Sequence, residues 1–213
     1  MEARILALPL FPLNVVLFPG QTLPLHIFEP RYRIMIRECV EKNEPFGVVL
    51  AYEPDTPLEI GTTARVTESK RLPKGLMDIT TVGEDRFKIL SLRESEHGYL
   101  IGDVELMPFS GDAERGLVNE TALHLRRYLK LMSRISGVRF RLDPFPTTAS
   151  ELALLAAIAL RLPLEAKQDL LNQETLTDLM RVEADILRLE NREMALAAAA
   201  IRPPEDEHGF CRN

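Results

Sequence analysis

The pattern of hydrophobic and polar positions divides the chain into two unlike parts. In the first part, short apolar runs alternate with turn residues, which predicts strands at residues 5–10, 22–28, 46–52, 62–71, 76–82, 86–92 and 99–106. Nine of the 15 prolines fall within the first 73 residues. Because proline fixes φ and removes a backbone donor, this region favours short strands over long helices. The one helix expected here begins at Pro30 and ends near Asn43.

After residue 110 the apolar positions recur every three to four residues, which is the spacing of one helix face. Asp112 is the expected N-cap of the first helix in this part, and Gly137 is expected to end it. Thr148 or Ser150 is expected to cap a second helix that ends at residue 160, and a short third helix follows residue 163. The expected product is a helical bundle.

The last predicted helix runs from about residue 175 to residue 200. Its apolar face is expected to contain Leu179, Val182, Ile186 and Leu189, and its charged residues, Glu183 among them, are expected on a solvated face. Together the two parts predict an α+β protein. We expect a β domain at residues 1–110, a helical subdomain at 111–202 and a flexible tail at 203–213.

Composition and charge narrow the classes of function. The net charge of −6, from 26 basic and 32 acidic residues, excludes a globally cationic surface for nucleic acid or anionic membranes. Two cysteines exclude a disulfide framework, and Cys39 is expected to be a small core residue. We therefore expect a reducing compartment, the cytoplasm. The chain shows no signal-peptide pattern, and its longest apolar stretch, residues 152–160, is too short to span a bilayer.

Motifs of known catalytic chemistry are missing from the sequence. The 11 glycines form neither a P-loop nor a Gly-x-Gly-x-x-Gly fingerprint, and the four histidines offer no metal-ligand spacing. His26 alternates with apolar neighbours, so we expect a hydrogen-bonded structural histidine rather than a base. We expect no enzyme, no cofactor and no metal. A small-molecule enzyme whose site is assembled without a sequence motif stays an alternative.

One stretch departs from the acidic character of the chain. Between residues 121 and 142 there is no acidic residue, but there are six basic ones: Arg126, Arg127, Lys130, Arg134, Arg139 and Arg141. The spacing of Arg126, Lys130 and Arg134 places them on one helix face. The patch Arg126, Arg127, Lys130 and Arg134 is a candidate site for an anionic partner. The other interpretation is a cationic helix end that the helix dipole favours.

Several blocks of the first part form a family signature. They are residues 8–13 (LPLFPL), 16–20 (VLFPG), 23–32 (LPLHIFEPRY), 61–66 (GTTARV), 72–75 (LPKG) and 83–89 (GEDRFKI). These blocks resemble the N-terminal, substrate-binding domain of the Lon protease family over about residues 5 to 190. The match is closest to stand-alone bacterial proteins that consist of this domain. In the second part, residues 162–164 and 167–171 are similar to the family as well.

The resemblance implies a PUA-like β-barrel, mixed but mainly antiparallel, with one inserted helix and a following helical bundle. It also implies a non-enzymatic module that binds unfolded or extended polypeptide, or a protease or chaperone partner, and no membrane. We expect its substrate-binding residues where the second strand meets the first helix, at Phe28, Glu29, Arg31 and Tyr32.

Two alternatives stay open. The aromatic residues at this junction are as consistent with packing of the helix on the barrel as with a binding site. PUA-like folds also host RNA binders, so a basic helix at residues 126–141 is an alternative site for nucleic acid. The sequence leaves the client, the role as adaptor or regulator in protein quality control, and the oligomeric state open.

Overall fold

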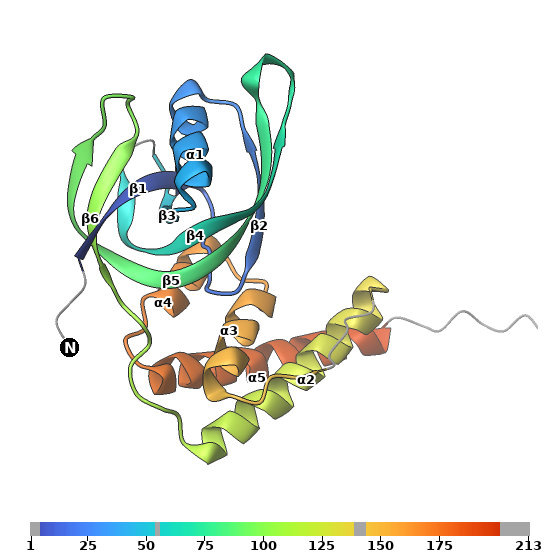
Figure 1. Cartoon of the computed structure of the whole chain (residues 1–213). Helices are drawn as coiled ribbons and strands as arrows, with labels where there is room; N and C mark the ends of the chain where they lie inside the picture. Colours follow the sequence, from blue (N-terminus) through green and yellow to red (C-terminus); the bar gives the residue numbers. More distant parts are fainter. Residues whose placement is uncertain (1–4, 54–55, 139–143, 201–213) are drawn as a thin grey trace, which may run out of the picture.

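The computed structural model describes residues 5–53, 56–138 and 144–200, and Figure 1 shows strands above a group of helices. The predicted tail, together with Arg139 and Arg141 of the basic stretch, lies outside the described residues. The strands are β1 (Ile5–Leu13), β2 (Thr22–Ile27), β3 (Phe46–Ala51), β4 (Pro57–Arg71), β5 (Met77–Glu94) and β6 (Leu100–Leu106). This half also contains helix α1 (Pro30–Lys42) and the 3₁₀ turn η1 (Pro73–Gly75).

The six strands form one mixed sheet in the order β2-β5-β4-β3-β1-β6, and β5 pairs with β6 as well. Five strands are therefore linked in a ring of pairings, and β2 is attached to this ring through β5. The β1–β3 pair is parallel and all the other pairs are antiparallel. The predicted α+β class, with a barrel-like and mainly antiparallel sheet, is confirmed.

The prediction of separate strands at 76–82 and 86–92 is wrong, because both belong to the single 18-residue strand β5. Residues 83–85 resemble a turn in the sequence, but the backbone there stays extended. Gly83 donates to the Gln21 carbonyl at 2.9 Å, and its own carbonyl accepts from the Gly20 amide at 2.8 Å. A Cβ at Gly83 would lie 2.4 Å from the Phe18 carbonyl oxygen, so this close approach requires glycine.

Helix α1 is inserted between β2 and β3 and follows its predicted limits. Pro30 occupies the first turn, and Asn43 ends the helix in the left-handed conformation with φ 54°. The buried face of α1 packs into the hydrophobic cluster on the inner side of the sheet. It comprises Tyr32, Met35, Ile36 and the predicted core residue Cys39.

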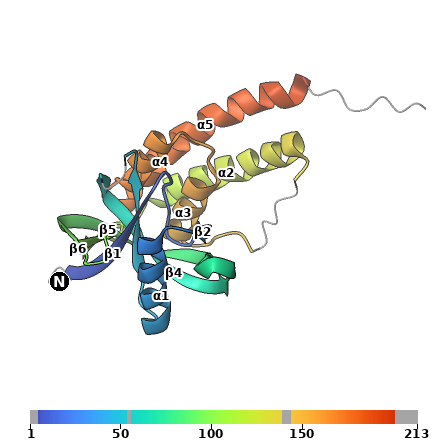
Figure 2. The same cartoon turned by 90° about the horizontal axis from the view of Figure 1, so that it is seen from above.

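The second half contains α2 (Arg115–Ser136), α3 (Ala149–Ala159), α4 (Leu164–Leu171) and α5 (Leu176–Ala200). Gly137 ends α2 and the Thr148 hydroxyl caps α3, as predicted. Asp112 is not the N-cap of α2, because that position belongs to Glu114 and the Asp112 carboxylate accepts from the next amide instead. Figure 2 shows α2 and α5 side by side, projecting away from the strands. None of these helices, over the described residues, has the length and apolar character that crossing a membrane requires.

The strands and the helices share a hydrophobic core. Val16, Phe18 and Leu50 from the first half belong to the same buried cluster as the apolar faces of α2, α3, α4 and α5. The limits of the proposed β domain and helical subdomain stay a prediction, since their side chains are packed together at this junction.

A buried arginine of β5 fastens the helices to the sheet. Arg86 is 1% exposed, and its Nη1 donates to the carbonyls of Leu171 and Gln173, the latter at 2.7 Å. Its guanidinium carbon lies 3.3 Å from the centroid of the Phe109 ring. Burial lowers the pKa of Arg86 to about 10. Through Nη1 the side chain joins β5 to the last residue of α4 and to the α4–α5 connection, while Nε and Nη2 are buried without a partner among the described residues.

The face of α5 differs from its prediction at two positions. Leu189 is 57% exposed, and the buried residue on this turn is Leu187. Glu183, predicted on the solvated face, is fully buried. It lies near the Lys167 ammonium, which donates to the last carbonyls of α3, Ala157 at 2.6 Å and Ile158 at 3.1 Å. Burial raises the pKa of Glu183 well above its ordinary value.

Replacement of Arg86 should weaken the connection between strands and helices. We expect Arg86→Met to lower the free energy of unfolding by about 2–4 kcal/mol, because two buried carbonyls lose their donors. The exposed ion pair of Arg93 with Asp103 supplies the control, and Arg93→Met should cost less than about 1 kcal/mol. Urea unfolding measures both. Equal losses in the two variants would contradict the role of Arg86.

Glu183 should make stability depend on pH. Because its pKa is raised in the folded state, its contribution is full below the unfolded value of 4.5 and is lost as pH rises above it. Glu183→Gln should remove this loss. The variant should match the parent near pH 4 and exceed it by about 1–3 kcal/mol at alkaline pH. Urea unfolding across this pH range tests the prediction, and a constant difference between the two proteins would overturn it.

Candidate functional site

The junction of β2 and α1 contains an open pocket of about 350 Å³. It brings together all four residues that the sequence predicted for substrate binding, Phe28, Glu29, Arg31 and Tyr32. Other side chains reach the same pocket from β1, from β2 and from the end of β3. They include Phe11, Pro12, Leu13, Leu25, His26 and Tyr52.

Arg31 and Glu29 form the charged part of this pocket. Arg31 Nε donates to Glu29 Oε2 at 3.1 Å, and Arg31 Nη1 donates to the Gly98 carbonyl at 3.1 Å. The guanidinium carbon also lies 4.7 Å from the centroid of the Tyr32 ring. The two opposite charges therefore compensate each other, and Arg31 fixes the start of α1 to the β5–β6 turn.

The two aromatic residues of the predicted site differ in exposure. Tyr32 is 4% exposed and stacks on Phe11 with ring centroids 4.1 Å apart, so it packs α1 onto β1. Phe28 is 61% exposed, and its ring lies beside His26 with centroids 6.4 Å apart. Of the pair, Phe28 is the side chain that a ligand reaches directly.

Sequence reasoning did not select Tyr52. This residue directly follows β3, is 55% exposed and lines the same pocket. Its hydroxyl donates to Glu165 Oε1 of α4 at 3.1 Å. The signal in the sequence is a tyrosine directly after the buried apolar run 46–51, but nothing local shows that it lines the same pocket as Phe28.

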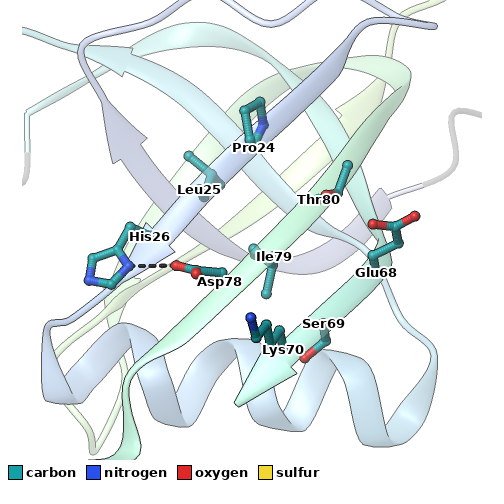
Figure 3. Close-up of a pocket in the computed structure, with 9 residues that line it drawn as sticks. All are labelled: Pro24, Leu25, His26, Glu68, Ser69, Lys70, Asp78, Ile79 and Thr80. Carbon is teal, nitrogen blue, oxygen red and sulfur yellow. Dashed lines mark hydrogen bonds and ion pairs between the residues drawn. The ribbon is translucent and has the colours of Figure 1, made fainter. Parts of the chain in front are cut away.

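A second pocket, of about 570 Å³, adjoins the first and shares Leu25 and His26 with it. Figure 3 shows His26 of β2 and Asp78 of β5 pointing toward one another. His26 Nδ1 and Asp78 Oδ1 are 2.6 Å apart, which confirms the expected hydrogen bond of this histidine. Lys70 of β4 lies in register with Asp78 on the other side.

The two pockets together form a surface that we call the β2 groove. Within the described residues β2 pairs with β5 alone, so its other edge is unpaired. Pro24 removes one backbone donor from this strand, which limits strand addition there. Exposed aromatic side chains and part of a sheet edge are features that suit an extended peptide.

The basic residues of α2 lie away from both pockets. Arg126 stacks on the Phe145 ring, with its guanidinium carbon 3.7 Å from the ring centroid. Arg127, Lys130 and Arg134 are exposed, and none of them forms an ion pair with another described residue. All four residues of the predicted patch are therefore exposed cations on α2, and one of them, Arg126, stacks on an aromatic ring.

Within the part of the chain that the structure describes, neither a metal-binding cluster nor an ionised cysteine is present. No three His, Cys, Asp or Glu side chains there are grouped to hold a metal ion. Burial raises the pKa of the Cys39 thiol to about 12, so this cysteine is not a thiolate nucleophile at neutral pH.

Solved structures define the class of this fold. A Lon N-terminal domain protein from Xanthomonas campestris superposes with a TM-score of 0.66 and 26% identity, over 83% of this chain and 96% of that chain. The N-terminal domain of the Mycobacterium avium complex Lon protease superposes with a TM-score of 0.68 at 19% identity, over 85% and 98%. The second likeness bears on the fold alone.

The sequence comparison assigns the family. The model of the ATP-dependent protease La (LON) substrate-binding domain matches residues 7–188, so the chain belongs to the Lon substrate-binding domain family. The Lon protease of Buchnera aphidicola is 28% identical over 90% of this chain, and protein cereblon of Danio rerio is 34% identical over 50% of it. The matched part is 27% of the length of each of these two relatives.

The two aromatic residues of the predicted site should respond differently to truncation. Tyr32→Ala should lower the free energy of unfolding by about 3 kcal/mol or more, because it leaves a cavity between α1 and β1. Phe28→Ala should change it by less than about 0.5 kcal/mol, because this ring is exposed. Urea unfolding of the two variants tests the difference. Equal losses would show that Phe28 is a packing residue as well.

Proposed function

We propose that this chain is a polypeptide-binding module that holds extended segments of client proteins in the β2 groove. Membership of a substrate-binding domain family supports the class of function. The observation that carries the proposal is the pair of exposed aromatic side chains, Phe28 and Tyr52, that line one pocket beside an unpaired strand edge.

The proposed mechanism is capture of an apolar side chain between Phe28 and Tyr52. Burial of one leucine or phenylalanine side chain contributes about 1.5–3 kcal/mol, and the aromatic rings add contact area at low entropic cost. The compensated pair of Arg31 and Glu29 bounds the pocket without a net charge. A single segment therefore binds weakly and with broad specificity, which suits recognition of unfolded chains.

The finer role that we propose is that of a non-enzymatic adaptor or regulator in protein quality control, acting in the cytoplasm. The absence of recognised catalytic motifs and the two cysteines of the sequence support this role. A pull-down from native extract, with the purified chain as bait, would capture its client or a protease or chaperone partner. Mass spectrometry would then identify the captured protein.

Removal of both exposed aromatic rings should weaken client binding. We expect Phe28→Ser with Tyr52→Ser to reduce the affinity for a permanently unfolded, alkylated reporter protein by about tenfold or more. Fluorescence anisotropy of the labelled reporter measures this change.

The matched control removes two exposed leucines from other parts of the surface. Leu123→Ser with Leu196→Ser, on α2 and α5, should change the reporter affinity by less than about twofold. If the parent shows no saturable binding, or if both double variants lose affinity equally, the assignment of the β2 groove fails.

A further inference from the structure

A third pocket lies between the second half of α1 and the hairpin of β4 and β5. The hairpin tip is close to α1 in both views of the molecule (Figures 1 and 2). This pocket of about 420 Å³ combines charged and apolar lining, and we call it the hairpin groove. Its residues are Arg37, Glu41, Arg71, Leu72, Gly75, Leu76 and Met77.

The Arg33 guanidinium packs against the turn at the tip of the hairpin, next to Gly75. Gly75 has φ 75°, a conformation that other residues rarely adopt. A Cβ at this position would lie 2.6 Å from Arg33 Nη2, so the Arg33 side chain rests against the backbone of the turn. Arg33 Nε is buried and has no hydrogen-bond partner among the described residues. Arg33 does not line the groove, so it adds positive charge beside the groove rather than a donor inside it.

The groove has an excess of positive charge. Arg33 and Arg37 are one helical turn apart on α1, and Arg71 reaches the same groove from β4. Over the described residues none of these three arginines forms an ion pair, and Glu41 is the one carboxylate among the lining side chains. By contrast, Arg65 and Arg93 of the same sheet are each paired with a carboxylate. An anionic ligand would relieve the repulsion between these guanidinium groups.

We propose that the hairpin groove binds an acidic segment of a polypeptide. Carboxylates of the ligand would accept hydrogen bonds from Arg37 and Arg71, which line the groove. Interspersed apolar side chains would contact Leu72, Leu76 and Met77. The mixed lining favours a peptide over nucleic acid, because no lining residue is aromatic and able to stack on a base. The proposal rests on the proposed function in taking polypeptide as the ligand, but it requires neither Phe28 nor Tyr52.

The probe for this groove is a fluorescein-labelled, glutamate-rich peptide with interspersed leucines, compared with a peptide in which glutamine replaces each glutamate. We expect the glutamate peptide to bind the full chain at least about tenfold more tightly at low salt, and to lose this advantage as salt rises. Equal affinities for the two peptides, or no saturable binding of the glutamate peptide, would overturn the proposal.

Charge reversal locates the site. Arg37→Glu with Arg71→Glu should weaken binding of the glutamate peptide by about tenfold or more. Arg127→Glu with Lys130→Glu changes the net charge equally on α2 and should weaken binding by less than about twofold. All four side chains are exposed, so both variants should fold. An equal loss in the two variants would show that binding depends on net charge alone, which contradicts the proposal.

Two further measurements separate this inference from its rivals. A single-stranded RNA probe that binds more tightly than the glutamate peptide, and that loses affinity in the Arg37/Arg71 variant, would overturn polypeptide as the ligand.

Phe28→Ser with Tyr52→Ser should leave binding of the glutamate peptide within about twofold. A loss of binding in this variant would contradict an independent hairpin groove. Intact peptide binding without reporter binding would instead show that the β2 groove assignment alone is wrong.

Discussion

The buried guanidinium of Arg86 is the interaction on which the arrangement of the two halves depends. The Arg86 side chain projects from β5 where this strand pairs with β4. Its Nη1 donates to the carbonyls of Leu171, the last residue of α4, and of Gln173, in the α4–α5 connection. An arginine buried in this way is costly unless its donors are used. The sheet supplies the charge and the helical half supplies two carbonyl acceptors for Nη1, while Nε and Nη2 have no hydrogen-bond partner among the described residues. The shared hydrophobic cluster then fills the remaining space between them.

Helix α1 has an equally important place in the candidate binding surface. Its first turn lines the β2 groove through Arg31 and Tyr32, and its second half lines the hairpin groove through Arg37 and Glu41. Tyr32, Met35 and Ile36 fix this helix against the sheet. A packed helix therefore links the two grooves, and under the two proposals one extended client of mixed composition would contact apolar and cationic surfaces in turn.

Features that depend on neighbouring residues in the sequence could be predicted. The start of α1 at Pro30, its end at Asn43 and the Thr148 cap are local, because each is decided by the chemistry of one turn. The continuity of β5 through Gly83 is not local, since the backbone bonds that keep it extended come from Gly20 and Gln21. The burial of Glu183 likewise depends on α3 and α4, and the presence of Tyr52 and Phe28 in one pocket depends on tertiary packing, because β3 and β2 are not neighbours in the sheet. The spacing of apolar residues along one helix or strand does not show which other elements it will contact.

The blocks that define the family and the side chains that line the grooves have different physical roles. Gly61 and Gly83 lie in these blocks, and a Cβ there would lie 2.5 Å from the Val48 carbonyl oxygen and 2.4 Å from that of Phe18, respectively. Arg86 lies in the same block, 83–89, and joins the two halves. These positions tolerate little change, whereas Phe28, Tyr52, Arg37 and Arg71 are exposed and make few internal contacts. Under the proposed function, the choice of client is therefore expected to reside in these exposed residues, where substitution alters recognition without disturbing the fold.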